Sequence, residues 1–498
     1  MMRYRKPLVT ALLSLAASAL LANCAVGPDF EKPAAPQVDL YTQKALPVTS
    51  GAIDVAGGEP QHFVAGQDIP GAWWEVFRSK PLNALIERSL KANPDIKAAQ
   101  AALTVARENV LVQEGAYYPE VAGSFAAATQ KTSAEISPTP SSGALYFNLY
   151  TPQVSVSYVP DVFGLNRRSV ESLEAQAEQA RFALAATHIT LSANVVAAAI
   201  QEASLREQIA AAHRLVAINT DMLQILRDQF AKGYVGRLDV AAQESQLAQI
   251  AATLPPLLKQ LAQQRDLLAA LSGGFPGHGV PEQFELSSLQ LPHDLPLSLP
   301  SRLVEQRPDV RQAEENLRAA SAQIGIAVAN RLPNITLAAN AGTVALTAGQ
   351  IFAGGAGFWT LAGAVTQPIF DGGALLHRER AARAAYTQAA EQYRSTVVTA
   401  FQNVADTLNA LEQDADALTA AAAARDAAKI SFDLTARQLK AGYTGNLALL
   451  NAEQTYQQAV ISLIQARANR YADTAALFQA LGGGWWNRKD VTAEAANP

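Results

Sequence analysis

Two stretches of 68 residues, 165–232 and 374–441, contain neither glycine nor proline. Both are dominated by Ala, Leu, Gln, Glu and Arg, which are good helix formers. At 1.5 Å of rise per residue, each would form a helix about 100 Å long. Helices of this length exceed the norm for globular domains, so the sequence predicts coiled-coil or helical-tube packing.

The chain is a tandem duplication. The motif Asn-Pro-Asp-Ile at 93–96 returns as Arg-Pro-Asp-Val at 307–310, the segment 160–164 returns at 368–372, and a Gly-Tyr-x-Gly turn occurs at 233–236 and 442–445. These motifs predict a first repeat over 81–290 and a second over 295–485. Each repeat is expected to have a long helix followed by a return helix. The return helix begins at about Leu238 in the first repeat and at about Leu447 in the second, and Pro255 and Pro256 interrupt the return helix of the first repeat.

Two nearly uncharged segments separate the helices, at about 119–160 and 333–370. Residues 333–370 contain no charged side chain, and 121–160 contain only Lys131 and Glu135. Period-two alternation, as at 153–158, favours β-hairpins, and aromatic residues near the strand ends are typical of outer-membrane strands. The aromatic residues are Tyr117, Tyr118, Tyr146, Tyr150, Phe358 and Trp359. A half-buried hairpin of a soluble domain remains the alternative for either segment alone.

The N-terminus predicts export and lipidation. Residues 1–23 resemble a lipoprotein signal peptide, with three basic side chains followed by an apolar run from Leu8 to Leu21. Cys24, the only cysteine, follows at the lipidation position; a stray buried cysteine beside an ordinary cleavage site is the alternative. Ala25 favours passage to the outer membrane. We expect an extended, Pro- and Gly-rich lipidated arm over 24–80 and a tail over 486–498.

After Leu21 no apolar run is expected to reach the length of a transmembrane helix, so any membrane crossing would use β-strands. Two hairpins supply four strands, which cannot close a barrel. Open strand edges in lipid would leave backbone groups unpaired at a cost of several kcal/mol each. Closure therefore needs at least two chains, and the residues alone do not choose between two and three.

Composition and motifs argue against several other functions. A net charge of −5 with 17% charged residues gives no indication of nucleic-acid binding. The six histidines are scattered without metal-ligand spacing, and no hydrolase or phosphate-binding motif occurs. We expect no enzyme, no metal and no cofactor, apart from acyl chains on Cys24.

The segment Cys-Ala-Val-Gly-Pro-Asp-Phe at 24–30, the duplicated halves and the paired Gly-Tyr-x-Gly turns resemble the outer-membrane factor (TolC-like) family. The resemblance is to the lipoprotein branch that serves resistance-nodulation-division efflux systems. It implies a mainly α fold with a membrane β-barrel, in which a trimer forms a 12-stranded barrel continued by a 12-helix periplasmic tunnel. A mixed equatorial collar would use residues around 275–300 and both termini.

The resemblance also implies partners: a homotrimer, a periplasmic adaptor, an inner-membrane resistance-nodulation-division transporter and outer-membrane lipid. The expected function is passive conduction of small molecules from periplasm to exterior. An exit duct of a type I protein-secretion system is the alternative. A third possibility, a periplasmic coiled-coil lipoprotein that crosses no membrane, predicts a steady heptad and no uncharged hairpins.

The resemblance places an adaptor-docking tip and a gate at the two Gly-Tyr-x-Gly turns. The implied docking residues are Val235, Gly236, Arg237, Thr444, Gly445 and Asn446. Leu447 occupies the family's leucine position at the gate, but Asn451 stands where an aspartate often rings the aperture. Asp239 either supplies another carboxylate ring or is a first-turn helix residue favoured by the dipole. The closed state would be held by polar links among Tyr234, Arg237, Asp239, Tyr443 and Asn451.

Overall fold

The structure, a computed structural model, describes residues 25–52, 55–131 and 146–488. The predicted signal peptide, Cys24 and residues 489–498 of the predicted tail lie outside the described residues. The chain forms two compact units, the first within residues 1–33, 104–179 and 313–393, and the second within 34–103, 180–312 and 394–498. The units therefore cut across the two sequence repeats, because each takes corresponding segments from both.

The two predicted long helices are present. Helices α4 (Leu165–Ala231) and α9 (Ala374–Lys440) each contain 67 residues. An aspartate from the repeated motif precedes both: the Asp161 carboxylate accepts bonds from the Asn166 and Arg167 amides, both 2.8 Å. Asp371 accepts from the Gly373 and Leu375 amides at the same distance. Each repeated motif thus supplies a carboxylate to the otherwise unpaired amides of a helix N-terminus.

One expectation about the helices is wrong. Helix α4 contains a stretch of mean hydropathy 1.6 that is long and apolar enough to cross a membrane, although no such stretch was expected after Leu21. Single polar residues, such as His188 and Asn194, interrupt the apolar ones in α4, so the mean hydropathy is high without an unbroken apolar run. Since 67% of that stretch is buried inside the protein, its apolar side chains are those of a packed core helix.

The shorter helices follow the duplicated order. They are α2 (Lys80–Ala92), α3 (Pro94–Glu114), α5 (Arg237–Ala251), α6 (Leu254–Leu271), α7 (Pro300–Gln306), α8 (Pro308–Ala329) and α10 (Asn446–Ala480). The first return is divided into α5 and α6, and the two prolines lie in the first turn of α6, where a missing amide costs least. The second return, α10, is continuous, as predicted.

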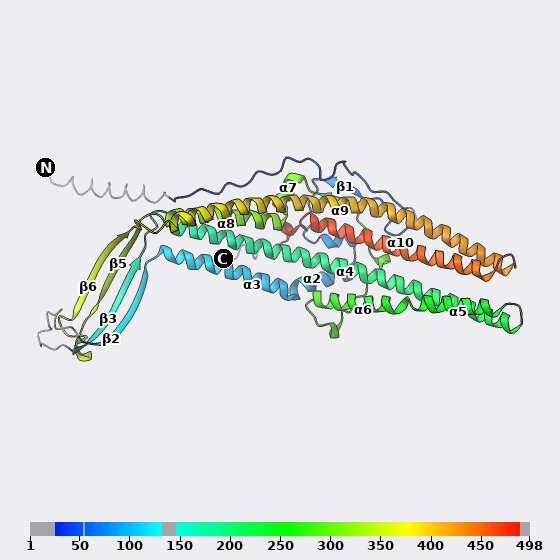
Figure 1. Cartoon of the computed structure of the whole chain (residues 1–498), viewed down its shortest axis with the longest axis horizontal. Coiled ribbons are helices and arrows are strands. Elements are labelled where there is room, and N and C mark those ends of the chain that lie inside the picture. Colours follow the sequence, from blue (N-terminus) through cyan, green and yellow to red (C-terminus); the bar gives the residue numbers. More distant parts are fainter. Residues whose placement is uncertain (1–24, 53–54, 132–145, 489–498) are drawn as a thin grey trace. The chain divides into compact units, whose positions relative to one another are not determined.

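The first unit contains a four-stranded antiparallel sheet with the order β2-β3-β5-β6 (Figure 1). Its strands are β2 (Glu120–Lys131), β3 (Tyr146–Tyr158), β5 (Asn334–Thr343) and β6 (Gly357–Thr366). All four lie in the two uncharged segments, so the hairpin prediction is confirmed for the strands. The connection between β2 and β3 lies outside the described residues.

The second unit is held together by segments far apart in the sequence. Strand β1 (His62–Ala65) pairs in parallel with β4 (Asp294–Leu297). The 3-10 helix η1 (Trp73–Phe77) is buried, and Trp73 stacks on Phe478 of α10 with ring centroids 5.4 Å apart. The predicted arm thus includes a strand and a core element as well as extended chain. Its apolar residues form a short cluster without periodicity, and for that reason the sequence alone predicts only extended chain there.

A buried charged cluster joins α9 and α10 in this unit. Arg470 is fully buried and donates to the Thr49 hydroxyl (3.1 Å) and the Glu59 carbonyl (2.6 Å). Burial, followed by a hydrogen bond and charge repulsion from the carboxyl of Asp473, raises the pKa of Asp414 to about 7. Two carboxyls so close together cannot both ionise cheaply, so they share a proton.

This cluster predicts a pH-dependent stability. The pKa of Asp414 is above its ordinary value of 3.8 in the fold. The stabilisation from its proton is therefore complete below pH about 4 and is lost as the pH rises through about 7. We expect the wild-type thermal midpoint, followed by circular dichroism, to fall between pH 5 and pH 8, and Asp414→Asn to flatten this fall. Asp416→Asn, on an exposed carboxylate of α9, is the control; an unchanged slope in Asp414→Asn would contradict the assignment.

Candidate functional site

The sheet of the first unit has two chemically different faces. Side chains alternate along a strand, and directly paired residues of an antiparallel sheet point to the same side. In the middle of the sheet, the register gives one face only apolar, aromatic and glycine residues: Val121, Gly123, Phe125, Pro152, Val154, Val156, Tyr158, Ile335, Leu337, Ala339, Ala341, Trp359, Leu361, Gly363 and Val365. Small and polar residues form the other face, among them Ser124, Gln153, Ser155, Ser157, Thr336, Asn340 and Thr360.

The apolar face is exposed in the single chain. Trp359 is 79% exposed, Leu361 is 76% exposed and Val365 is 70% exposed. A contiguous apolar surface of this kind marks contact with lipid or with another protein. An apolar outer face combined with a small, polar inner face is the pattern of strands that surround a water-filled lumen in a membrane.

The two outer strands of the sheet have free edges within the described part of the chain. Strand β2 pairs only with β3, and β6 pairs only with β5. Their backbone amides and carbonyls on the outer side therefore face no other described strand. In lipid, such groups need partners from another sheet edge.

The second unit carries both Gly-Tyr-x-Gly turns, which join α4 to α5 and α9 to α10 (Figure 1). Helix α4 ends in a Schellman motif: the Tyr234 amide donates to the Gln229 carbonyl, and the Gly233 amide donates to the Phe230 carbonyl, both 2.9 Å. Gly233 has φ of +76°, a conformation that requires glycine.

Helix α9 ends in the same motif. The Tyr443 amide donates to the Gln438 carbonyl (2.9 Å), and the Gly442 amide donates to the Leu439 carbonyl (3.0 Å). Gly442 has φ of +77°. Both turns are therefore defined by local hydrogen bonds and should keep their shape when a partner docks.

The two return helices begin differently. The Asp239 carboxylate accepts a hydrogen bond from the Gly236 amide (3.1 Å), which closes the first turn of α5. In α10 the equivalent position is Ala448, without a carboxylate. Asp239 therefore has the helix-terminal role expected from the dipole. A role in a charged ring stays a separate prediction.

The tip side chains are strongly exposed in the single chain: Tyr234 is 78% exposed, Tyr443 is 85% exposed and Leu447 is 69% exposed. Leu447 and Asn451 share the exposed side of α10. Within the described part of one chain, no hydrogen bond or ion pair joins Tyr234, Arg237 or Asp239 to Tyr443 or Asn451. The predicted polar links between the turns are thus not made inside one chain, and links between chains stay a prediction.

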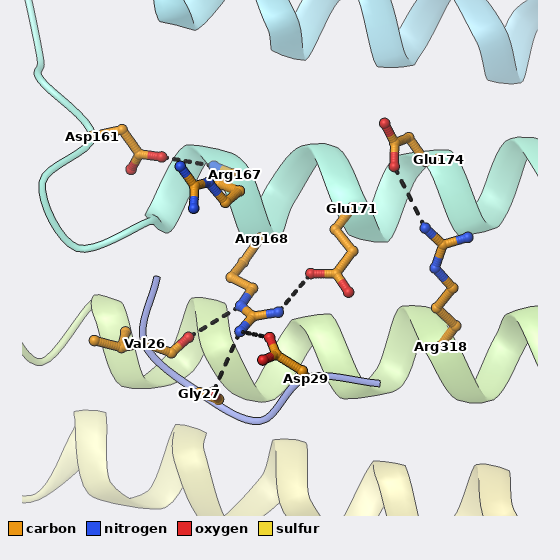
Figure 2. Close-up of polar contacts among 9 residues, drawn as sticks. All are labelled: Val26, Gly27, Asp29, Asp161, Arg167, Arg168, Glu171, Glu174 and Arg318. Carbon is orange, nitrogen blue, oxygen red and sulfur yellow. Dashed lines mark hydrogen bonds and ion pairs between the residues drawn. The ribbon is translucent and has the colours of Figure 1, made fainter. Parts of the chain in front are cut away.

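A second site, in the first unit, holds the segment directly after Cys24 (Figure 2). Arg168 of α4 is only 4% exposed. Its guanidinium donates to the carbonyls of Val26 (3.1 Å) and Gly27 (3.3 Å) and to the carboxylates of Asp29 (2.7 Å) and Glu171 (2.7 Å). We call this set of contacts the Arg168 clasp.

Glycines allow the close approach of the chain at the clasp. Gly27 has φ of +95°, and a Cβ added to it would lie 2.5 Å from the Cα of Gly325 in α8. A Cβ at Gly325 would lie 2.8 Å from the Arg168 side chain, and one at Gly164 would lie 2.7 Å from the Cα of Ala25. The segment 25–29 therefore lies in a fitted site between α4 and α8.

The sequence analysis did not single out Arg168. The only signals were the glycines at 27 and 164 and the acidic residue at position 29, and none of these identifies a partner 139 residues away. Among the described residues, no group of His, Cys, Asp and Glu could hold a metal ion.

Comparisons with known proteins agree with this geometry. The model of the family described as outer membrane efflux protein matches residues 85–274 and 299–483, one stretch in each repeat. The toluene efflux pump outer membrane protein TtgF of Pseudomonas putida is 30% identical over 98% of this chain and 100% of its own length. TtgC of the same species, also a toluene efflux pump outer membrane protein, is 29% identical over 98% of both chains.

The solved structure of the outer-membrane channel OprN has 26% sequence identity and a TM-score of 0.82, covering 93% of this chain and all of that one. The fold is therefore that of the outer-membrane channels, with membrane strands and long tunnel helices in one chain. The family model matches a stretch in each repeat, and the relatives align with nearly the whole chain. This chain therefore belongs to the outer membrane efflux protein family and is a channel component rather than an enzyme.

Proposed function

We propose that three copies of this chain close into one outer-membrane channel, the exit duct of a tripartite efflux pump. The duct conducts small molecules passively from the periplasm to the exterior. The observation that carries this proposal is the two-faced sheet with free edges at β2 and β6. Its apolar face suits lipid, its polar face suits a wet lumen, and its edges need partners.

The sheet and the family together support a count of three. Four strands per chain give twelve strands in a trimer (three times four), which is within the range of outer-membrane barrels. Each chain supplies the long helices α4 and α9, and we propose that the shorter helices of the two repeats make up two further helix lengths. We propose that three such sets form a twelve-helix tunnel in the periplasm.

We also propose that Cys24 carries acyl chains that anchor the mature N-terminus in the outer membrane. The Arg168 clasp supports this, because it holds residues 26–29 beside the start of α4, where the Val26 amide also donates to the Phe163 carbonyl (3.1 Å), in the unit that carries the strands. A neighbouring Cys24 would then be held close to the membrane strands. Through the clasp, the lipid-bearing N-terminus would be attached to α4 at a defined position.

The proposed partners are a periplasmic adaptor and an inner-membrane transporter of the resistance-nodulation-division class. The adaptor would contact the two turns through Val235, Gly236, Arg237, Thr444, Gly445 and Asn446. Full-length relatives described as efflux pump proteins favour this assembly over a type I secretion system. The rigid Schellman turns suit a docking surface, since little conformational entropy is lost on binding.

At the aperture we propose a gate of Leu447 and Asn451, without a second-repeat carboxylate ring. Both side chains share the exposed side of α10 just after its start. Asp239 closes the first turn of α5 through Gly236, which uses one carboxylate oxygen for the helix. A ring of Asn451 amides would attract cations less strongly than a ring of carboxylates.

The barrel proposal is tested by charges placed on the two faces of β6. Leu361→Arg puts a cation on the face assigned to lipid, where it costs about 2–4 kcal/mol near the bilayer midplane. We expect it to abolish the heat-modifiable trimer on gels and the conductance in planar bilayers. The adjacent Ala362→Arg points to the lumen and should keep the trimer while lowering conductance. Equal effects of both variants, or a wild type without conductance, would overturn the barrel.

Proteolysis after Glu31 tests the clasp. The cleavage rates of wild type, Arg168→Ala and Arg167→Ala are compared. Loss of the charge-assisted bonds should open the segment and speed cleavage on the order of tenfold, equivalent to about 1.4 kcal/mol. Arg167, exposed on the same turn, is the control. The mass of the released peptide 24–31 should show the acyl chains on Cys24. An unmodified cysteine would refute the anchor, and equal cleavage of all three proteins would refute the clasp.

Docking is tested with cysteines at Val235 and Thr444, which should cross-link to the adaptor in whole cells. A cysteine at Ile430, 62% exposed on α9 but away from the turns, is the control. Cross-linking at position 430 but not at the turns would place the adaptor elsewhere.

A further inference from the structure

Three polar side chains are buried together in the second unit, close to the turns. Asn219 of α4 and Gln243 of α5 are completely buried, and Glu453 of α10 is 3% exposed. Burial of such groups is unfavourable unless hydrogen bonds compensate for the lost water; among the described residues the side-chain oxygen of Gln243 has no partner. These three residues come from three helices and from both sequence repeats.

Asn219 is the centre of the group. Its side-chain amide nitrogen donates to the Leu215 carbonyl (2.9 Å) and to the Glu453 carboxylate (2.5 Å). Its side-chain oxygen accepts from the Gln243 amide nitrogen (2.8 Å). Both protons of the Asn219 amide are therefore used, and one of them ties α4 of the first repeat to α10 of the second.

Glu453 gains a hydrogen bond from another helix through Asn219. Burial raises the pKa of Glu453, whereas hydrogen bonds from Asn219 and from Gln457, on α10 itself, lower it. In the part of the chain that the structure describes, no Lys, Arg or His forms an ion pair with Glu453. Separating α10 from α4 inside the protein would leave this buried carboxyl group without the donor from α4, which is unfavourable.

The position of Glu453 connects this bond to the aperture. Glu453 is the eighth residue of α10, about 10 Å from the start of the helix. Leu449 and Leu450, one turn earlier, are buried on the same packed side. Leu447 and Asn451 lie on the exposed side of the same two turns. A rotation or outward swing of the beginning of α10 as one rigid piece would therefore also move Glu453 away from Asn219.

We propose that Asn219 and Glu453 form a latch that holds the beginning of α10 against α4 and α5 and keeps the aperture closed. This inference rests on the proposed channel function and adds a closing contact inside each subunit. The latch is separate from the exposed turn residues. Gln243 orients Asn219 through its oxygen, so that the amide nitrogen points to Glu453.

Exchange of the two groups tests the latch. Asn219→Asp removes the amide donor and places two carboxyl groups side by side; in alkaline buffer, where such a pair no longer shares a proton, they repel each other and the channel should open. We expect the open probability in planar bilayers to rise on the order of tenfold, the factor for a difference of about 1.4 kcal/mol. Cells should also become more sensitive to vancomycin, which is too large to cross an intact outer membrane. Adding Glu453→Gln restores an amide–carboxylate pair with reversed roles and should return both measurements toward wild type.

Glu244→Gln is the matched control, because Glu244 is next to Gln243 on α5 but forms an exposed ion pair with Arg227. It should leave the open probability unchanged. The latch is refuted if trimeric Asn219→Asp is as closed as wild type, or if the double variant is as open as Asn219→Asp.

If Asn219→Asp does not assemble, Asn219→Ala provides the same test, since it also removes the donor. Failure of both variants to form trimers would make the pair a folding determinant and reject the latch. A wild-type protein that never conducts would instead refute the proposed channel, so the two failures are distinguishable.

Discussion

Backbone hydrogen bonding at the ends of regular structure is the constraint on which this protein depends. Helix termini leave amides and carbonyls unpaired, and here they are satisfied by Asp161 and Asp371 at the starts of the long helices and by Schellman turns at their ends. The same demand acts on the sheet, whose outer strands have no described partner on one side. In water this would be tolerable, but in lipid it makes association with further chains necessary.

The N-terminal segment meets the same constraint in another way. Residues 25–29 belong to no helix or strand, so their carbonyls need donors from elsewhere. Arg168 supplies two of these donors and pairs with Asp29 at the same time. One buried guanidinium thus fixes extended chain to a helix, and its charge is balanced by Asp29 and Glu171.

The duplicated halves keep the same backbone plan but have diverged in their side chains. Gly233 and Gly442 are equivalent, because only glycine suits the left-handed turn at both places. Asp239 and Ala448 differ, so only the first return helix has an acidic cap. The bond between Asn219 and Glu453 joins the two halves, and the position that corresponds to Asn219 in the second repeat is Ala428. Divergence therefore leaves this contact without a symmetric counterpart.

Much of the fold could be predicted, because its signals are local. Absence of glycine and proline predicted the long helices, the proline pair predicted the break between α5 and α6, and loss of charge predicted the strands. The hydropathy of α4 is not evident from runs of apolar residues, because single polar residues interrupt them. The sequence does not reveal the core element of the arm, because the burial of Trp73 depends on Phe478, which is distant in the sequence.

The sequence by itself determined the helix lengths, the turns, the strands and the family resemblance, since each depends on neighbouring residues. The tertiary structure alone decided which face of the sheet is apolar across all four strands, because that depends on register. It alone brought Arg168 to residues 26–29 and Asn219 to Glu453. Hydrogen bonds between residues 139 and 234 positions apart leave no periodic trace in a single sequence, because their partners are chosen by packing and not by spacing.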